Sequence, residues 1–281
     1  MKTFSGRTQK LIRLALTEDI GNGDVTARAL LPRRPQTATA VVIAKQSGIF
    51  CGEPLVRYLC RFVRPRLNVR FFVRDGAAFG RNQKLFLLKG RLTSLLAAER
   101  VLLNFLGRLT GITTLTRSFV KLARRRGVAV YDTRKTTPLW RELEKYAVKT
   151  GGGCNHRMDL GAQVFVKENH KVFGRLERLK KLSRPYVMEV RSQRELMQVL
   201  AYRPSVILFD NFTPGRLKAL VGKVRKQNRK IGLEASGGIR LQNLQAYLNT
   251  GIDRISVGQL THSVPSVDLS MLVLKPSRRH R

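Results

Sequence analysis

The chain has 281 residues and a hydrophobic fraction of 43%, which excludes a disordered or fibrous chain and favours a globular protein. Its charge is unusual, because 54 Lys and Arg residues against 18 Asp and Glu residues give a formal net charge of +36. Net charge concerns partners and solubility and does not determine the fold. Two interpretations stay open: a solvated basic surface, which the even spread of basic residues favours, or attraction to nucleic acid or an anionic membrane.

The cysteines and the N-terminal segment exclude several further classes. Cys51, Cys60 and Cys154 form neither a CxxC pair nor a zinc-binding pattern. Cys154 admits a nucleophilic role, but no activating neighbour singles it out, so a packing role is favoured. Residues 1–13 lack the apolar segment of a secretory signal, and no apolar run approaches the length of a membrane span. We therefore expect a soluble, cytoplasmic protein that does not associate with membranes.

The first elements predict a mixed α+β region. Apolar residues at helical spacing predict a helix over Thr8–Thr17, and a segment rich in turn formers follows it. The carboxylates of that segment admit metal binding, but turn and helix-cap roles are favoured; they are Glu18, Asp19 and Asp24. A helix is expected over Gly52–Val63, and strands are expected over Thr37–Lys45, Asn68–Val73 and Leu85–Lys89. Strands and helices in this order suggest a layer with an antiparallel component.

A long helical run begins at Thr93 and has one broad apolar face. Gly111 is expected to break or bend it before a second helical stretch that ends at Arg126. The pair Glu99–Arg100 interrupts the apolar face. A solvent-facing salt bridge and a functional role are equally favoured for this pair.

Beyond residue 126, short apolar segments recur with helical stretches between them. After the first gap their spacing is about 22 residues, the length of one strand and one helix. Nearly continuous apolar character is typical of strands buried on both faces of a parallel sheet. We therefore predict a parallel sheet closed into a barrel or a barrel-like sheet. The six segments are Val128–Tyr131, Val164–Val166, Tyr186–Met188, Val206–Phe209, Ile231–Leu233 and Ile255–Val257.

Charged residues or glycines follow all six predicted strands. Because strand carboxyl ends converge on one face of an α/β barrel, these residues predict a site there. They are Asp132–Lys135, Lys167–His170, Glu189, Asp210–Asn211, Glu234–Gly238 and Gly258–Gln259.

The stretch from Asp132 to His170 is rich in cationic or cationisable side chains, which predicts binding of a strong anion. Arginine binds carboxylates in a bidentate manner, whereas lysine supplies a point charge. The side chains concerned are Arg134, Lys135, His156, Arg157 and Lys167.

Two glycine turns and two carboxylates complete the predicted site. The turns Ser236–Gly238 and Val257–Gln259 together favour a phosphate site, although each alone is also typical of a tight turn. Three roles are compatible with Glu189 and Asp210: binding of Mg²⁺ or ribose hydroxyls, general acid–base chemistry, or neutralisation of the surrounding cations. The inferred ligands are a multiply charged carboxylate, a phosphorylated sugar and magnesium.

These motifs, in this order, resemble the quinolinate phosphoribosyltransferases, also called carboxylating nicotinate-nucleotide pyrophosphorylases, over nearly the whole chain. The most specific segments are Glu99–Arg100 with Leu103–Leu106, Asp132–Pro138, Gly151–Arg157, Lys167–His170, Asp210–Asn211 and Glu234–Ile239. The resemblance implies an N-terminal α/β sandwich, a C-terminal parallel α/β barrel of about six strands, closed or open, and at least a dimer, up to a hexamer. We place the domains at 1–111 and 112–265, followed by a C-terminal segment and basic tail at 266–281.

The resemblance also implies the reaction and the role of each residue. The family transfers a phosphoribosyl group from phosphoribosyl pyrophosphate to quinolinate and releases carbon dioxide. Arg100 would enter the partner subunit's site to help hold quinolinate. The dicarboxylate pocket would consist of Arg134, His156, Arg157 and Lys167. Thr133 and Lys135 would bind substrate, with Lys135 on the sugar diphosphate, while Glu189 and Asp210 would hold ribose hydroxyls and Mg²⁺. The phosphate end would be lined by Ser236, Gly237, Gly238, Val257, Gly258, Gln259 and His262. Lys135, Glu189 and Asp210 are the expected catalytic residues.

The chain departs from the family pattern at two informative positions. Leu139 stands where a glycine is common, and Arg191 stands where a second carboxylate usually follows Glu189. Two alternatives are kept: a molybdenum-transport-associated pyrophosphorylase homologue, whose motifs fit less well, and a degenerate relative that binds nucleic acid through its basic surface.

Overall fold

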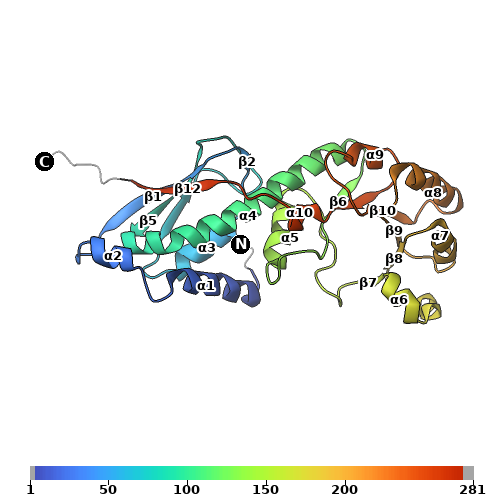
Figure 1. The fold of residues 1–281 in the computed structure, drawn as a ribbon, viewed down its shortest axis with the longest axis horizontal. Coiled ribbons are helices and arrows are strands. Elements are labelled where there is room, and N and C mark those ends of the chain that lie inside the picture. Colours follow the sequence, from blue (N-terminus) through green and yellow to red (C-terminus); the bar gives the residue numbers. More distant parts are fainter. Residues whose placement is uncertain (1–3, 275–281) are drawn as a thin grey trace. The chain divides into compact units, whose positions relative to one another are not determined.

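The computed structural model describes residues 4–274, which fold into two compact units (Figure 1). The first unit comprises residues 4–115, 138–151 and 264–274, and the second comprises residues 116–137 and 152–263. Residues 264–274 thus group with the N-terminal sheet, whereas the sequence-based division set 266–281 apart. The basic tail at 275–281 lies outside the described residues.

The first unit contains a four-stranded antiparallel sheet in the order β12-β1-β5-β3. Its strands are β1 (Thr37–Ala44), β3 (Asn68–Phe71), β5 (Lys84–Arg91) and β12 (Leu269–Leu274). The predicted strands and the antiparallel component are confirmed, but β12 was not predicted. It pairs with β1 from far along the chain, with Leu274 opposite Thr39 and Leu269 opposite Ala44. A separate ribbon joins β2 (Gly48–Ile49) to β4 (Ala78–Phe79).

The helices of the first unit are α1 (Gly6–Ile20), α2 (Val25–Leu30), α3 (Glu53–Phe62), α5 (Arg141–Thr150) and the first part of α4. Both predicted helices, α1 and α3, are confirmed. Asp24 caps α2, because its carboxylate accepts a hydrogen bond from the Ala27 amide at 2.8 Å. Glu18 and Asp19 lie in the last turn of α1. Within residues 4–274, no group of three or more metal-ligating side chains is assembled.

The helix α4 (Leu92–Arg124) is continuous, so of the predicted break or bend at Gly111 the break is wrong and the bend stays a prediction. Gly111 has a packing role instead, because a Cβ atom there would lie 2.2 Å from the carbonyl oxygen of Pro265. One turn earlier the chain also passes close, and the Val267 amide donates to the Gly107 carbonyl at 2.9 Å. Neither α4 nor any other helix between residues 4 and 274 is both long and apolar enough to cross a bilayer.

The departure at Leu139 has a conformational cost. Its φ is +66°, in the left-handed region that favours glycine, and 68% of the residue is exposed. The next residue, Trp140, stacks on Phe105 of α4 with ring centroids 4.4 Å apart. This aromatic contact holds the segment although the backbone at Leu139 is strained by about 1 kcal/mol.

The second unit contains a six-stranded parallel sheet in the order β6-β11-β10-β9-β8-β7. Each predicted segment overlaps one strand, so the parallel α/β architecture is confirmed. The strands are β6 (Ala129–Tyr131), β7 (Val164–Val166), β8 (Tyr186–Val190), β9 (Val206–Asp210), β10 (Gly232–Ser236) and β11 (Arg254–Ser256). The helices between and after them are α6 (Glu168–Phe173), a 3-10 helix at Leu176–Lys181, α7 (Gln193–Leu200), α8 (Pro214–Gln227), α9 (Leu244–Leu248) and α10 (Gln259–His262).

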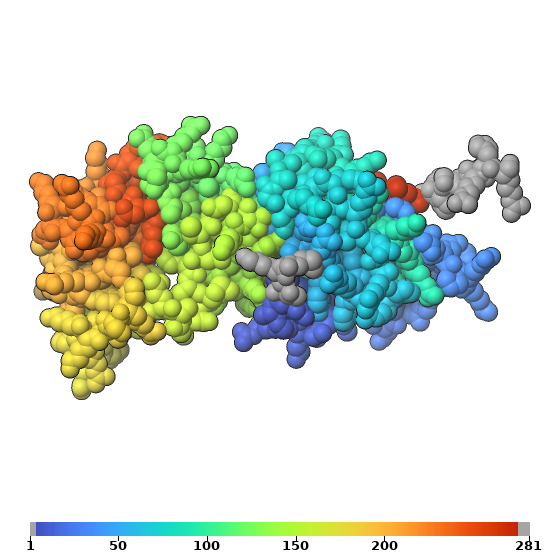
Figure 2. All heavy atoms as spheres, turned by 180° about the vertical axis from the view of Figure 1, so that it is seen from behind, coloured from blue at the N-terminus to red at the C-terminus, as the bar shows by residue number. Residues whose placement is uncertain are grey.

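The two edges of this sheet differ in their surroundings. At the β6 edge, the Cys154 amide donates to Val130 at 2.7 Å, and its carbonyl accepts from Asp132 at 3.0 Å. Cys154 therefore extends the sheet through its backbone. At the β7 edge, α6 and the 3-10 helix protrude in yellow from the surface of the second unit (Figure 2).

Two glycine substitutions in helices are expected to act in opposite directions. Gly111→Ala forces a Cβ atom into the Pro265 carbonyl and should lower the free energy of unfolding by about 1–3 kcal/mol. Gly222→Ala, in α8, meets no atom within 4 Å and should raise it by about 0.5–1 kcal/mol. Urea unfolding of both variants measures the difference, and stabilisation by Gly111→Ala would contradict the packing role.

Candidate active site

The pairing register of the parallel sheet determines which polar side chains meet. Paired residues on neighbouring strands project to the same face, and residues two apart on a strand share that face. One row across the sheet therefore consists of Glu189, Leu208, Glu234 and Arg254. The next row toward the carboxyl ends consists of Asp210, Ser236, Ser256 and Tyr131. Polar groups from five strands thus gather on one face near the carboxyl ends.

Below these rows the same face is apolar. Phe165, Val187 and Leu208 form a buried cluster, with Val206 packed against it. The predicted site therefore has a hydrophobic floor, which excludes water from beneath the charged groups and strengthens their interactions.

His156 is held from three sides. Its Nε2 lies 2.6 Å from Glu234 Oε1 and 3.1 Å from Ser256 Oγ. Its backbone amide donates to Asp132 Oδ1 at 2.8 Å. Because Asp132 and Glu234 are fully buried, the orientation of the imidazole is set by the interior of the sheet.

Glu234 is the anionic centre of this arrangement. The Arg254 Nε lies 2.7 Å from Glu234 Oε2, and the Ser256 hydroxyl donates to Glu234 Oε1. Burial acts to raise the pKa of Glu234, but His156, then Arg254 and Ser256, outweigh it and hold the pKa below the usual glutamic acid value.

Sequence reasoning did not assign roles to the groups that support His156, which are Asp132, Glu234, Arg254 and Ser256. The available signal was a charged residue directly next to an apolar segment, as at Glu234 after Ile231–Leu233 and Arg254 before Ile255–Val257.

Two predicted cations lie over the ring of Phe165, and a third, Arg134, acts on one of them. The Arg157 guanidinium lies 5.2 Å from the ring centroid and donates to the Gln163 carbonyl at 2.8 Å. The Lys167 ammonium lies 5.3 Å from the same centroid. Partial burial, followed by the charge of Arg134, lowers the pKa of Arg157. Arg134 is therefore close enough to repel Arg157, and an anion with two carboxylates would relieve this repulsion.

The predicted carboxylates are also brought together, but each is already paired with a cation. Lys167 lies one register step beyond Val166–Met188, opposite Glu189, and its Nζ is 3.1 Å from Glu189 Oε2. The Arg191 Nε lies 3.3 Å from Asp210 Oδ2 and 3.7 Å from Glu189 Oε1.

The first glycine turn requires glycine for steric reasons. Gly237 and Gly238 have φ values of +95° and +62°. A Cβ atom on Gly237 would lie 2.1 Å from Asn211 Oδ1, and the Asn211 amide donates to the Ser236 carbonyl at 2.8 Å. The turn thus packs closely against the end of β9. Its phosphate-binding role stays a prediction.

The second glycine turn converges with Lys135. A Cβ atom on Gly258 would lie 2.8 Å from His262 Nε2 and 3.6 Å from Lys135 Cδ. The Lys135 amide donates to Thr133 Oγ1 at 3.0 Å, and the Thr261 hydroxyl donates to the Lys135 carbonyl at 2.7 Å.

The flanking residues of this turn complete the group at the end of β11. The Val257 amide donates to the Tyr131 carbonyl at 2.9 Å. The Gln259 Oε1 is buried without a hydrogen-bond partner among residues 4–274.

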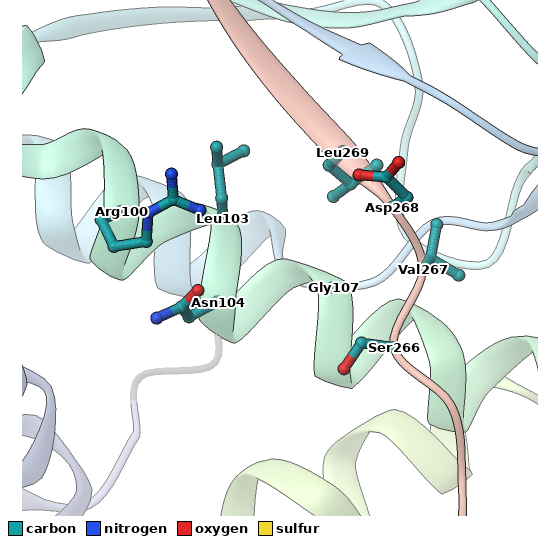
Figure 3. Close-up of a pocket in the computed structure, with 8 residues that line it drawn as sticks. All are labelled: Arg100, Leu103, Asn104, Gly107, Ser266, Val267, Asp268 and Leu269. Carbon is teal, nitrogen blue, oxygen red and sulfur yellow. The ribbon is translucent and has the colours of Figure 1, made fainter.

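Arg100 belongs to the first unit, whereas all other predicted site residues belong to the second. Its side chain is exposed, as the solvent-facing interpretation predicts, but the described residues contain no ion pair between it and Glu99. Arg100 and Asn104 lie on α4 beside the segment that leads into β12 (Figure 3). They line a pocket of about 430 Å³ with Leu103, Gly107, Ser266, Val267, Asp268 and Leu269.

Comparisons with known proteins agree over nearly the whole chain. Residues 24–110 match the N-terminal domain of quinolinate phosphoribosyl transferase, and residues 112–272 match the C-terminal domain. A Bacillus subtilis protein described as a probable carboxylating nicotinate-nucleotide pyrophosphorylase is 36% identical over 271 residues, covering 94% of this chain and 92% of the relative.

Solved structures give the same result. The nicotinate-nucleotide pyrophosphorylase from Francisella tularensis has a TM-score of 0.88 and 34% identity, covering 97% of this chain and 98% of that one. The Ehrlichia chaffeensis protein of the same name has a TM-score of 0.89 and 30% identity, covering 98% of this chain and 100% of that one.

The buried Glu234 cluster predicts a pH-dependent stability difference. Glu234→Gln leaves Arg254 without its anionic partner and should lower the free energy of unfolding at pH 7 by about 3 kcal/mol. Because the pKa of Glu234 is lowered by folding, its contribution is complete above pH of about 4.3 and is lost as pH falls through the folded value. The difference between wild type and variant should therefore shrink in acid.

Denaturant unfolding at neutral and acidic pH measures this difference. Glu177→Gln, an exposed change of the same chemistry in the 3-10 helix, is the control and should stay within about 0.5 kcal/mol of wild type. A difference for Glu234→Gln that is constant across pH would contradict the assignment.

Proposed function

The chain belongs to the quinolinate phosphoribosyltransferase family, and we propose that it transfers a phosphoribosyl group from phosphoribosyl pyrophosphate to the ring nitrogen of quinolinate. The products are nicotinate mononucleotide, pyrophosphate and carbon dioxide, a step of NAD biosynthesis. The observation that carries the proposal is the gathering of Arg157 and Lys167 on the Phe165 ring beside Glu189. One edge of the sheet thus offers cations that can bind a dicarboxylate. Beside them it offers a carboxylate that can stabilise positive charge on a sugar.

Quinolinate binding follows from the charges and rings of this edge. The substrate is a dianion, and Arg134 and Arg157 supply planar guanidinium groups that match carboxylates. The His156 ring lies 5.1 Å from Tyr131 and 5.9 Å from Phe165, between centroids. The Tyr131 and Phe165 rings, inclined by 50° and 65° to the imidazole plane, offer aromatic contacts to the pyridine ring, while the cations select its two carboxylates.

The transfer step is promoted by preorganised charge. The ring nitrogen forms a bond to the anomeric carbon as the bond to pyrophosphate breaks, and pyrophosphate leaves with the electron pair. Positive charge develops on the ribose, where Glu189 and Asp210 stabilise it. Lys135 and the turns at Gly237 and Gly258 receive the departing diphosphate, since backbone amides and an ammonium group suit phosphate oxygens.

Decarboxylation follows from the new pyridinium. The bond to the 2-carboxylate breaks, its electron pair stays on ring carbon 2, where the adjacent cationic nitrogen stabilises it, and a proton from solvent then takes the place of the carbon dioxide. The protein needs only to hold the ring and the second carboxylate in place.

The predicted magnesium ligands do not fit an ion held by this chain alone. Glu189 is paired with Lys167, and Asp210 is paired with Arg191. Magnesium commonly binds through substrate phosphates with only one or two protein carboxylates. We therefore treat magnesium as part of the phosphoribosyl pyrophosphate substrate.

An assay of quinolinate-dependent pyrophosphate release tests the proposed function. Wild type should turn over, and Arg134→Ala should lower kcat/KM for quinolinate by about 10²- to 10³-fold, because loss of one guanidinium removes a charge-assisted contact. The KM for phosphoribosyl pyrophosphate should change far less. Arg178→Ala, an exposed arginine of the 3-10 helix, is the matched control. No turnover by wild type would refute the proposal.

We also propose a homodimer, or a hexamer built from dimers, in which Arg100 completes the partner's dicarboxylate pocket. Mixing inactive Arg100→Ala and Arg134→Ala protomers should then restore about one quarter of wild-type activity, because half of the dimers are mixed and each mixed dimer has one intact site. Mixing Arg134→Ala with Arg157→Ala should restore none, since both residues belong to the same pocket. Equal recovery in both mixtures, or none in either, would exclude donation by Arg100.

A further inference from the structure

Arg191 lies among the carboxylates of the site because of the sheet register. It follows β8 two residues after Glu189, so the two side chains share a face. One register step beyond Val190–Phe209 places Arg191 beside Asp210 at the end of β9. Arg191, which stands where the family pattern has a second carboxylate, therefore directs its side chain toward Glu189 and Asp210.

The contacts of Arg191 involve three carboxylates. Its Nε lies 3.3 Å from Asp210 Oδ2 and 3.7 Å from Glu189 Oε1, and its Nη1 pairs with Glu168. Burial acts to lower the pKa of Arg191, but Glu168, Asp210 and Glu189 together raise it. The guanidinium is therefore charged at neutral pH.

The oxygens that would bind a metal already face hydrogen-bond donors or cations. Asp210 Oδ2 accepts from the Asn211 side chain at 3.1 Å in addition to its contact with Arg191. Glu189 Oε2 faces Lys167 at 3.1 Å, and Glu189 Oε1 faces Arg191. The side chain of Glu189 is only 5% exposed, so its carboxylate cannot turn freely to water.

The local charge also disfavours a divalent ion. Three carboxylates, from Glu168, Glu189 and Asp210, with the two cations Lys167 and Arg191, sum to −3 + 2 = −1. A carboxylate at position 191 would give −4 + 1 = −3. Mg²⁺ and Mn²⁺ bind through several oxygens and gain most from a site of high negative charge.

We propose that the guanidinium of Arg191 is an internal cation that takes the place of a divalent metal between Glu189 and Asp210 in the substrate-free protein. This position is the one that the proposed function assigns to the ribose, so the inference depends on that function for its catalytic consequence alone. In that setting any metal must arrive on the diphosphate, because Arg191 already contacts both carboxylates.

Direct binding of Mn²⁺ to the substrate-free protein, followed by electron paramagnetic resonance, tests this proposal. Wild type should bind weakly, and Arg191→Glu should bind at least about tenfold more tightly, because it removes a cation and supplies two ligand oxygens. Arg191→Gln should bind more tightly than wild type but less tightly than Arg191→Glu. Circular dichroism shows whether each variant folds. If Arg191→Glu does not fold, the comparison of Arg191→Gln with wild type tests the proposal.

Arg194→Glu is the matched control. It makes the same change in net charge three residues away, on the exposed surface of α7. The proposal is overturned if wild type binds Mn²⁺ as tightly as Arg191→Glu, if Arg194→Glu tightens binding equally, or if neither substitution at position 191 tightens it. Neither substrate is present, so this result is independent of the transferase assay.

Discussion

The register of the parallel sheet is the constraint on which the site depends. Each strand of the second unit is short, and each contributes at most a few polar residues. Because Glu234 lies opposite both Leu208 and Arg254, the polar residues of neighbouring strands align in rows across the sheet. Side chains of one row contact those of the next. A slip of one residue in any strand would turn its polar groups to the opposite face, where the sheet is apolar. The charge pattern therefore requires this one register.

Buried charge at the centre of the sheet is tolerated because it is compensated on every side. Glu234 has no exposed surface, and an isolated carboxylate there would be strongly unfavourable. It is matched by Arg254, by the Ser256 hydroxyl and by His156, whose orientation it sets in turn. The same network thus stabilises the anion and positions a ring that faces the proposed substrate, which links the stability of the unit to the geometry of the site.

The outer part of the site is organised by cations. Phe165 supports Arg157 and Lys167 through its ring face, so the apolar floor and the charged rim are joined by one residue. Arg191 extends this arrangement onto Glu189 and Asp210. A site built this way places charge of both signs on the chain itself, before any ligand arrives, and loses little energy in reorganisation when charge develops on the sugar.

The sequence by itself determined the six strands of the second unit, their parallel arrangement and the polar residues at their ends. It could do so because strands buried on both faces are continuously apolar, and charge can appear only where they end or where it is paired. Other features were decided only by contacts between distant segments. Helix α4 runs through Gly111, where Pro265 packs too closely for a side chain, β12 joins a sheet whose other strands end before residue 92, and Arg254 neutralises Glu234 from the next strand. Arg191 was visible in the sequence as a departure from the family pattern. Only the register of β8 against β9 brought its guanidinium between the two carboxylates, because local sequence patterns do not specify pairing between strands.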